Sequence, residues 1–304
     1  MEVELMTGRF IDQKYVRQDI PAEDIERQWH DISYMPGDHH QLDIFLPNEG
    51  QGPFPVIVDL YGGGLYRGRR GSFKLAPAMA LLRQYGYAIV SPDYSLLWQA
   101  DYPTQIYEVK AALRYLHAQG AQYQLDVDRM ALMGESSGAQ LAVTVAATEN
   151  VGKMEKRDFG LYPQVSEKVK AVIAMYGPYE FDKFKEQFAS SGVKPKFAET
   201  GTATSFEGLL FKGQAPKDVP DLVQKVNPAT YFAPGMPPIL AFAGKADPVV
   251  PYQQTVNMMA AARKVLGAAK TPYYLVPNGV HGIKDYMSPE YTKIKAAFLK
   301  KWLN

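Results

Sequence analysis

Apolar positions fall along the chain in two kinds of segment, short continuous runs and longer runs with helical spacing. The short runs predict strands at 32–34, 42–46, 55–61, 87–90, 130–133, 169–176, 238–243 and 273–276. The longer runs predict helices at 73–85, 104–118, 139–148, 252–266 and 288–303. From 55 onward strands and helices alternate, which predicts an α/β fold: a mostly parallel, twisted sheet of about eight strands with helices on both faces. The loops that follow the parallel strands should then meet at one edge of the sheet.

Before residue 55 the pattern is less regular. Pro21, with acidic residues close behind it, predicts a helix start. Pro36-Gly37-Asp38 predicts a hairpin turn between the first two strands. His39 and His40 follow that turn; as neighbours on a strand they would point to opposite faces, so we expect surface residues that share no metal.

One segment interrupts the alternation. Residues 179–226 are rich in Gly, Pro, Lys and Phe and have no clean period, and they are long for a connection. We expect a partly helical cap inserted into a single domain of residues 1–304. The aromatic residues of this segment (Phe181, Phe184, Phe206, Phe211) would line a pocket or pack the cap against the sheet.

Composition narrows the class of protein. The formal net charge of +1 argues against a nucleic-acid binder, and the cluster Arg67, Arg69 and Arg70 is expected to be a solvated loop. The absence of cysteine excludes thiolate catalysis and disulfides. Met1–Leu5 has no features of a signal peptide, and no apolar run is long enough to span a membrane, so we expect a cytoplasmic protein with no membrane partner. Homo-oligomerisation is left open.

The sequence Gly134-Glu135-Ser136-Ser137-Gly138 stands between a predicted strand and a predicted helix. A sharp strand-to-helix turn has no room for side chains at its flanks, and it lifts the central side chain clear of the sheet. This context makes Ser136 the candidate nucleophile, although small residues also cluster in ordinary turns.

A serine hydroxyl needs a base to take its proton and a carboxylate to orient that base. His281 is the only histidine after Ser136, and it lies in the loop after the last predicted strand. Asp247 follows the preceding strand and is the preferred acid, with Asp182 as the rival. Their chain order, Ser, Asp, His, is that of hydrolases built on such a sheet.

Gly62-Gly63-Gly64 follows the third predicted strand. We expect the amides of Gly63, Gly64 and Ser137 to form an oxyanion hole; a phosphate-binding loop is the alternative, but the Gly-Lys-Ser/Thr ending is missing. Candidates for an apolar substrate pocket are Tyr66, Trp98, Tyr102, Tyr176 and Phe181, each of which could instead serve only for packing.

With these motifs the chain resembles serine esterases of the α/β-hydrolase fold. It is similar to hormone-sensitive-lipase-like carboxylesterases and, more closely, to the bifunctional feruloyl and acetyl-xylan esterase-like family. The resemblance spans about residues 40–303 and implies a Ser136–Asp247–His281 triad that hydrolyses esters through an acyl-enzyme, with no metal or organic cofactor. The chain departs from the family at Tyr61, where a histidine usually precedes the glycines.

The resemblance does not indicate which ester is the substrate. Short acyl esters, acetylated sugars and feruloyl-type esters all fit a serine carboxylesterase. An amidase or peptidase on the same scaffold is a second interpretation, and a non-catalytic small-molecule receptor is a third. The presence of all three triad candidates argues against the receptor.

Overall fold

A computed structural model describes residues 8–149 and 151–304 of the chain. The expectation that Met1–Leu5 carries no signal peptide lies outside the described residues. Within the described residues no helix combines the length and the apolar character that a membrane crossing requires.

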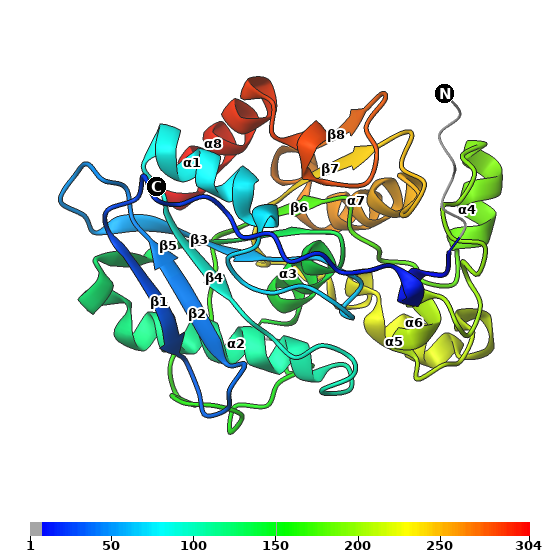
Figure 1. Cartoon of the computed structure of the whole chain (residues 1–304), viewed down its shortest axis with the longest axis horizontal. Helices are drawn as coiled ribbons and strands as arrows, with labels where there is room; N and C mark the ends of the chain where they lie inside the picture. The colour runs from blue at the N-terminus through cyan, green and yellow to red at the C-terminus, as the bar shows by residue number, and fades with distance from the viewer. Residues whose placement is uncertain (1–7, 150) are drawn as a thin grey trace.

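A single eight-stranded sheet forms the centre of the described residues, in the order β1-β2-β4-β3-β5-β6-β7-β8 (Figure 1). The strands are β1 (Gln28–Ser33), β2 (Gln41–Phe45), β3 (Phe54–Leu60), β4 (Ala88–Pro92), β5 (Leu125–Glu135), β6 (Ala171–Met175), β7 (Ile239–Gly244) and β8 (Tyr273–Val276). Strand β2 is antiparallel to both β1 and β4, and every later pair is parallel. The predicted hairpin and mostly parallel sheet are confirmed.

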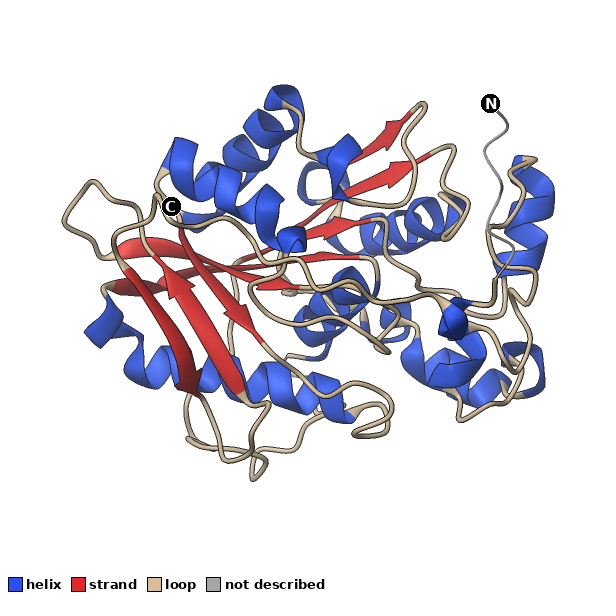
Figure 2. Ribbon diagram, viewed as in Figure 1, coloured by secondary structure: helices blue, strands red, loops and turns tan. Residues whose placement is uncertain are grey.

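Helices cover both faces of this sheet (Figure 2). On one face lie α1 (Ala76–Tyr85) and α8 (Pro289–Leu303), and on the other α2 (Thr104–Gln119), α3 (Ser137–Thr148) and α7 (Gln253–Leu266). Three further helices lie beyond the strand ends: α4 (Phe184–Ser191), α5 (Phe206–Leu210) and α6 (Pro220–Val226). Short 3₁₀ segments connect several of them. Helix α8 begins as predicted, with the Ser288 hydroxyl accepting from the Tyr291 amide and Pro289 in the first position.

Successive side chains of the central strands point to opposite faces of the sheet, and each face has its own hydrophobic core. On β3, Val56 and Val58 belong to the core packed against α2, α3 and α7, whereas Ile57 belongs to the core packed against α1 and α8. Met130 and Met133 of β5 divide in the same way. Because both faces are buried, β6 (AVIAM) and β7 (ILAFAG) carry no polar side chain and β3 carries only Asp59, which is why these strands stood out in the sequence.

Two expectations for the surface are wrong. Residues 22–25 form a turn, not a helix: the Ile25 amide donates to the Ala22 carbonyl at 3.0 Å, and β1 begins only a few residues later, so no helix has room to extend. The arginine cluster is not a solvated loop either. Arg67 Nη1 donates to the Gln13 carbonyl at 2.7 Å, and the half-buried Arg70 donates to Asp43 at 3.1 Å.

Residues 179–226 contain α4, α5 and α6. The aromatic side chains of this segment pack against one another, with Phe184 and Phe206 at 5.5 Å between ring centroids. Phe206 also contacts Phe10 from the N-terminal segment at 5.5 Å. The segment lies beside the carboxyl ends of the parallel strands (Figure 1).

Candidate active site

Ser136 lies at the sharp turn between β5 and α3. Its backbone has φ 53° and ψ −126°, a conformation that L-residues rarely adopt. The flanking glycines are required by space: a Cβ on Gly138 would collide with the Leu60 carbonyl oxygen, and one on Gly134 with the Gly138 carbonyl oxygen. The Ser136 amide donates to the Met175 carbonyl at 2.9 Å, which ties the turn to β6.

His281 and Asp247 meet Ser136 from the loops after β8 and β7. His281 Nε2 lies 3.0 Å from Ser136 Oγ, and His281 Nδ1 lies 2.8 Å from Asp247 Oδ2. The other Asp247 oxygen accepts from the amides of Val249 at 2.8 Å and Val250 at 2.9 Å, so the carboxylate is fixed on both sides. With Asp247 accepting at Nδ1–H, the Nε2 lone pair of a neutral imidazole faces the serine hydroxyl.

The two loops are joined by their backbones. The Lys245 amide donates to the Val276 carbonyl at 2.9 Å, and the Ala246 amide donates to the Gly279 carbonyl at 3.1 Å. The rival acid Asp182 is exposed and pairs with Lys183 Nζ at 3.8 Å. The geometry thus brings Asp247, and not Asp182, to the imidazole.

The glycine loop after β3 approaches the same serine. A Cβ on Gly62 would lie 2.7 Å from the Ser136 Cβ. Gly63 and Gly64 have φ of 138° and 66°, where a side chain would be strained. Within residues 8–149 and 151–304 the amides of Gly63 and Gly64 donate no hydrogen bond, so both stay available to a ligand.

A buried ion pair holds this loop. Glu135 Oε1 accepts from the Gly62 amide at 2.5 Å and lies 3.0 Å from Lys74 Nζ. Burial raises the pKa of the Glu135 carboxyl, but the Lys74 ammonium, His281 and the Gly62 amide together outweigh burial and hold the pKa below its usual value. Sequence reasoning missed both residues, although Glu135 occupies a variable position of the G-x-S-x-G motif.

Tyr61 directly precedes the three glycines of this loop. Its ring stacks on Tyr94 with centroids 4.3 Å apart, and its hydroxyl donates to the Tyr94 carbonyl at 3.2 Å. The Tyr94 hydroxyl in turn donates to the Tyr61 carbonyl. The two tyrosines thus link the glycine loop to the loop after β4.

A cavity of about 420 Å³ opens at Ser136 and His281. Gly63, Gly64 and Ser137 lie in its wall, together with Phe181, Phe197 and Phe206 from residues 179–226 and with Phe10 from the N-terminal segment. Phe10 was not anticipated, since no motif or period marks the segment that carries it. The cavity wall is mainly apolar, which suits an acyl chain or ring.

Of the predicted pocket residues, only Phe181 lines this cavity. Trp98 is 65% exposed and donates from Nε1 to the Tyr66 carbonyl at 3.1 Å. Tyr102 faces a different cavity, beside Tyr107 and Phe211. Tyr176 is buried behind the site, its ring edge against the His281 ring at 4.8 Å. The prediction failed for these residues because loop position alone does not set the direction of a side chain.

The sheet order, the serine turn and the hydrogen-bonded Ser136, His281 and Asp247 define an α/β-hydrolase fold. Residues 42–261 match the BD-FAE family, and the chain belongs to that family.

Similar proteins carry esterase names. Esterase LipQ of Mycobacterium tuberculosis is 28% identical over 258 residues, which are 84% of this chain and 57% of LipQ. A truncated carbohydrate esterase from gut microbiota is 26% identical with a TM-score of 0.80, covering 93% of this chain and 99% of that one. A bifunctional GH43-CE protein of Bacteroides eggerthii is 30% identical with a TM-score of 0.78, covering 90% of this chain and 38% of that one. The chain spans about half the length of the curated relatives it matches.

Proposed function

We propose that the protein is a serine carboxylesterase that hydrolyses small to medium carboxylic esters through an acyl-enzyme. The observation that carries the proposal is the continuous chain of hydrogen bonds from Ser136 Oγ through His281 to Asp247, at 3.0 and 2.8 Å. Membership of the BD-FAE family and the esterase names of similar proteins support it.

In this mechanism Ser136 Oγ attacks the ester carbonyl while His281 Nε2 takes its proton. The amides of Gly63, Gly64 and Ser137 then donate to the oxyanion that forms. His281 returns the proton to the departing alkoxide, and the acyl group remains on Ser136. Water repeats the cycle and releases the acid, with Asp247 stabilising the imidazolium in both halves.

The cavity limits the ester that the site can hold. A volume of about 420 Å³ bounded by phenylalanine rings favours a short acyl chain or a single ring. We propose a small-molecule ester as the partner, with acetylated-sugar and feruloyl-type esters included in the class. Side chains, backbone amides and the attacking water supply every group that this mechanism uses.

The test is covalent labelling combined with turnover. The parent chain should react with a fluorophosphonate probe and hydrolyse p-nitrophenyl acetate, whereas Ser136→Ala should lose both while its circular dichroism stays unchanged. Ser190→Ala is the matched control: it removes a hydroxyl that donates to the Gln187 carbonyl at 3.0 Å in α4, outside the cavity, and should keep labelling and turnover. Labelling or turnover retained in Ser136→Ala would refute the assignment. Comparing p-nitrophenyl esters with the matching anilides separates an esterase from an amidase.

A further inference from the structure

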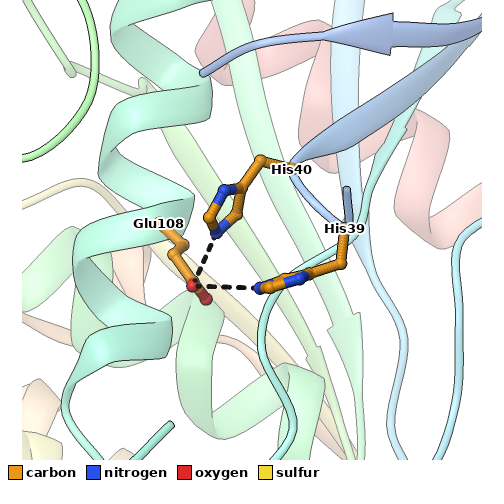
Figure 3. A group of neighbouring side chains, drawn as sticks. All are labelled: His39, His40 and Glu108. Carbon is orange, nitrogen blue, oxygen red and sulfur yellow. Dashed lines mark hydrogen bonds and ion pairs between the residues drawn. The ribbon is translucent and has the colours of Figure 1, made fainter. Parts of the chain in front are cut away.

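A second group of chemically active side chains lies outside the candidate active site. His39, His40 and Glu108 converge at one point from two different elements, as Figure 3 shows. The histidines belong to the turn before β2, and Glu108 belongs to α2. The expectation that both histidines are surface residues on opposite faces is wrong, because the turn continues through His39 and β2 begins only at Gln41.

The surroundings of His40 are unusual for a histidine. Its Nδ1 lies 2.6 Å from the Pro36 carbonyl oxygen, and its Nε2 lies 3.0 Å from Glu108 Oε1. A carbonyl and a carboxylate both only accept. A neutral imidazole has one N–H, so if Nδ1 donates to Pro36, the Nε2 lone pair faces a carboxylate oxygen. The arrangement is therefore complete only when Nε2 holds a proton or binds a cation.

His39 faces the same carboxylate. Its Nε2 lies 3.9 Å from Glu108 Oε1, and the two imidazole rings are 4.2 Å apart between centroids. Ser95 Oγ bridges the group, 2.8 Å from His39 Nε2 and 2.5 Å from Glu108 Oε1. The remaining Glu108 oxygen accepts from the Ser95 amide at 2.6 Å, which fixes the carboxylate. Two imidazoles thus share one anchored anion.

The local backbone is shaped to hold this arrangement. Gly37 has φ 123°, and a Cβ there would collide with the His40 ring. The Glu108 side chain is almost fully buried, at 1% exposed, while His39 is 37% exposed. The His39 side chain is therefore accessible to solvent, whereas Glu108 is buried. An ion can reach the three side chains from the His39 side.

We propose that His39 Nε2, His40 Nε2 and Glu108 Oε1 form a binding site for a divalent transition metal, with Zn²⁺ as the best match. Ligands about 2.1 Å from a tetrahedral zinc ion lie about 3.4 Å from one another. The two nitrogen-to-carboxylate distances of 3.0 and 3.9 Å fall on either side of that value, and all three ligand atoms lie within 4.8 Å of one another. To complete the set, the partly exposed ring of His39 would have to move toward the other two ligands.

The ligand set and its support match the chemistry of zinc. Two imidazoles and one carboxylate are a known zinc set, with water in the fourth position. The bond from His40 Nδ1 to the Pro36 carbonyl is the kind of outer contact that orients a metal-bound histidine. The metal would replace the bridging proton between Nε2 and the carboxylate.

Such a site would tie together three parts of the fold: the β1–β2 turn, helix α2 and the loop after β4 that carries Ser95. Tyr94, next to Ser95, packs on Tyr61 of the glycine loop. The ion would thus stabilise the loop after β4, which contacts the glycine loop of the candidate active site. It would not contact the substrate. The proposal does not depend on the ester chemistry.

The experiment measures Zn²⁺ binding to the tag-free chain after EDTA treatment and dialysis, by calorimetry and by metal analysis. We expect one Zn²⁺ per chain, and a rise in the midpoint of thermal unfolding when Zn²⁺ is added. His39→Ala should weaken binding at least tenfold and remove that rise. Because His39 is partly exposed, the variant should fold, and p-nitrophenyl acetate turnover without added metal should stay unchanged.

Two controls locate the ion. His30→Ala removes an exposed histidine near a single carboxylate, 3.5 Å from Asp43, and should leave binding intact. His281→Ala tests whether the metal binds at the candidate active site instead. Co²⁺ offers a further readout, since its visible bands should disappear in His39→Ala. Absence of binding in the parent, binding unchanged in His39→Ala, or binding lost in His281→Ala would each overturn the proposal.

Discussion

Glu135 offers a direct test of how the glycine loop is positioned. Its carboxylate accepts from the Gly62 amide at 2.5 Å and pairs with Lys74 at 3.0 Å, and its side chain is 4% exposed. It lies next to Ser136 but is directed to the loop. We expect its removal to misplace the amides of Gly63 and Gly64. Stabilisation of the transition state should then fall more than the affinity for substrate.

The magnitude follows from the bond that is lost. A hydrogen bond to a charged group contributes about 1.5–3 kcal/mol, which corresponds to roughly 10- to 150-fold in rate. Glu135→Gln keeps a neutral acceptor for the Gly62 amide, so we expect a fall in kcat of about tenfold. Glu135→Ala removes the acceptor and should cost about 100-fold. KM should change little in both variants.

Steady-state hydrolysis of p-nitrophenyl acetate measures both quantities, with chemical denaturation to confirm folding. Glu167→Gln is the matched control, since Glu167 is also buried and paired, 2.8 Å from Arg114, but precedes β6 at the opposite edge of the sheet. It should lower stability without lowering kcat. If Glu135→Ala is folded and keeps a kcat within twofold of the parent, the positioning argument fails.

Two further predictions concern the His281 imidazole and helix α5. Asp247→Asn should lower kcat by about 10³–10⁴-fold, because the amide no longer holds His281 in the tautomer that faces Ser136, and stopped-flow acylation should show the same loss; a loss below tenfold would mean that Asp247 does not orient the imidazole. Burial raises the pKa of Glu207 in α5 to about 7, above its unfolded value of 4.5. A raised carboxyl pKa destabilises the fold as pH rises from about 4.5 to 7, by an amount of the order of 3 kcal/mol. Glu207→Gln, which stays neutral, should therefore gain in unfolding free energy relative to the parent as pH increases across that window, as measured by urea denaturation; an equal difference at pH 4.5 and pH 8 would contradict the assignment.

The sequence determined the parts of this protein that depend on local rules. Strands buried on both faces are mostly apolar, so their positions and the α/β class could be predicted from the sequence. The serine turn was visible as well, since the close approach of Gly138 to Leu60 admits only glycine. Chain order then selected His281 and Asp247, because the loops after parallel strands share one edge of the sheet.

Tertiary structure alone decided what depends on the direction of side chains and on contacts between distant segments. Phe10 lines the cavity although its segment has no hydrophobic periodicity. Trp98 lies in a loop that was predicted to supply pocket residues, yet it is exposed to solvent. The 68 positions that separate His40 from Glu108 carry no signal that the two side chains meet, and the turn that aims His40 inward depends on how the hairpin packs against α2. Periodicity records which face of an element is buried, but a meeting of single polar groups is set by the packing of whole elements.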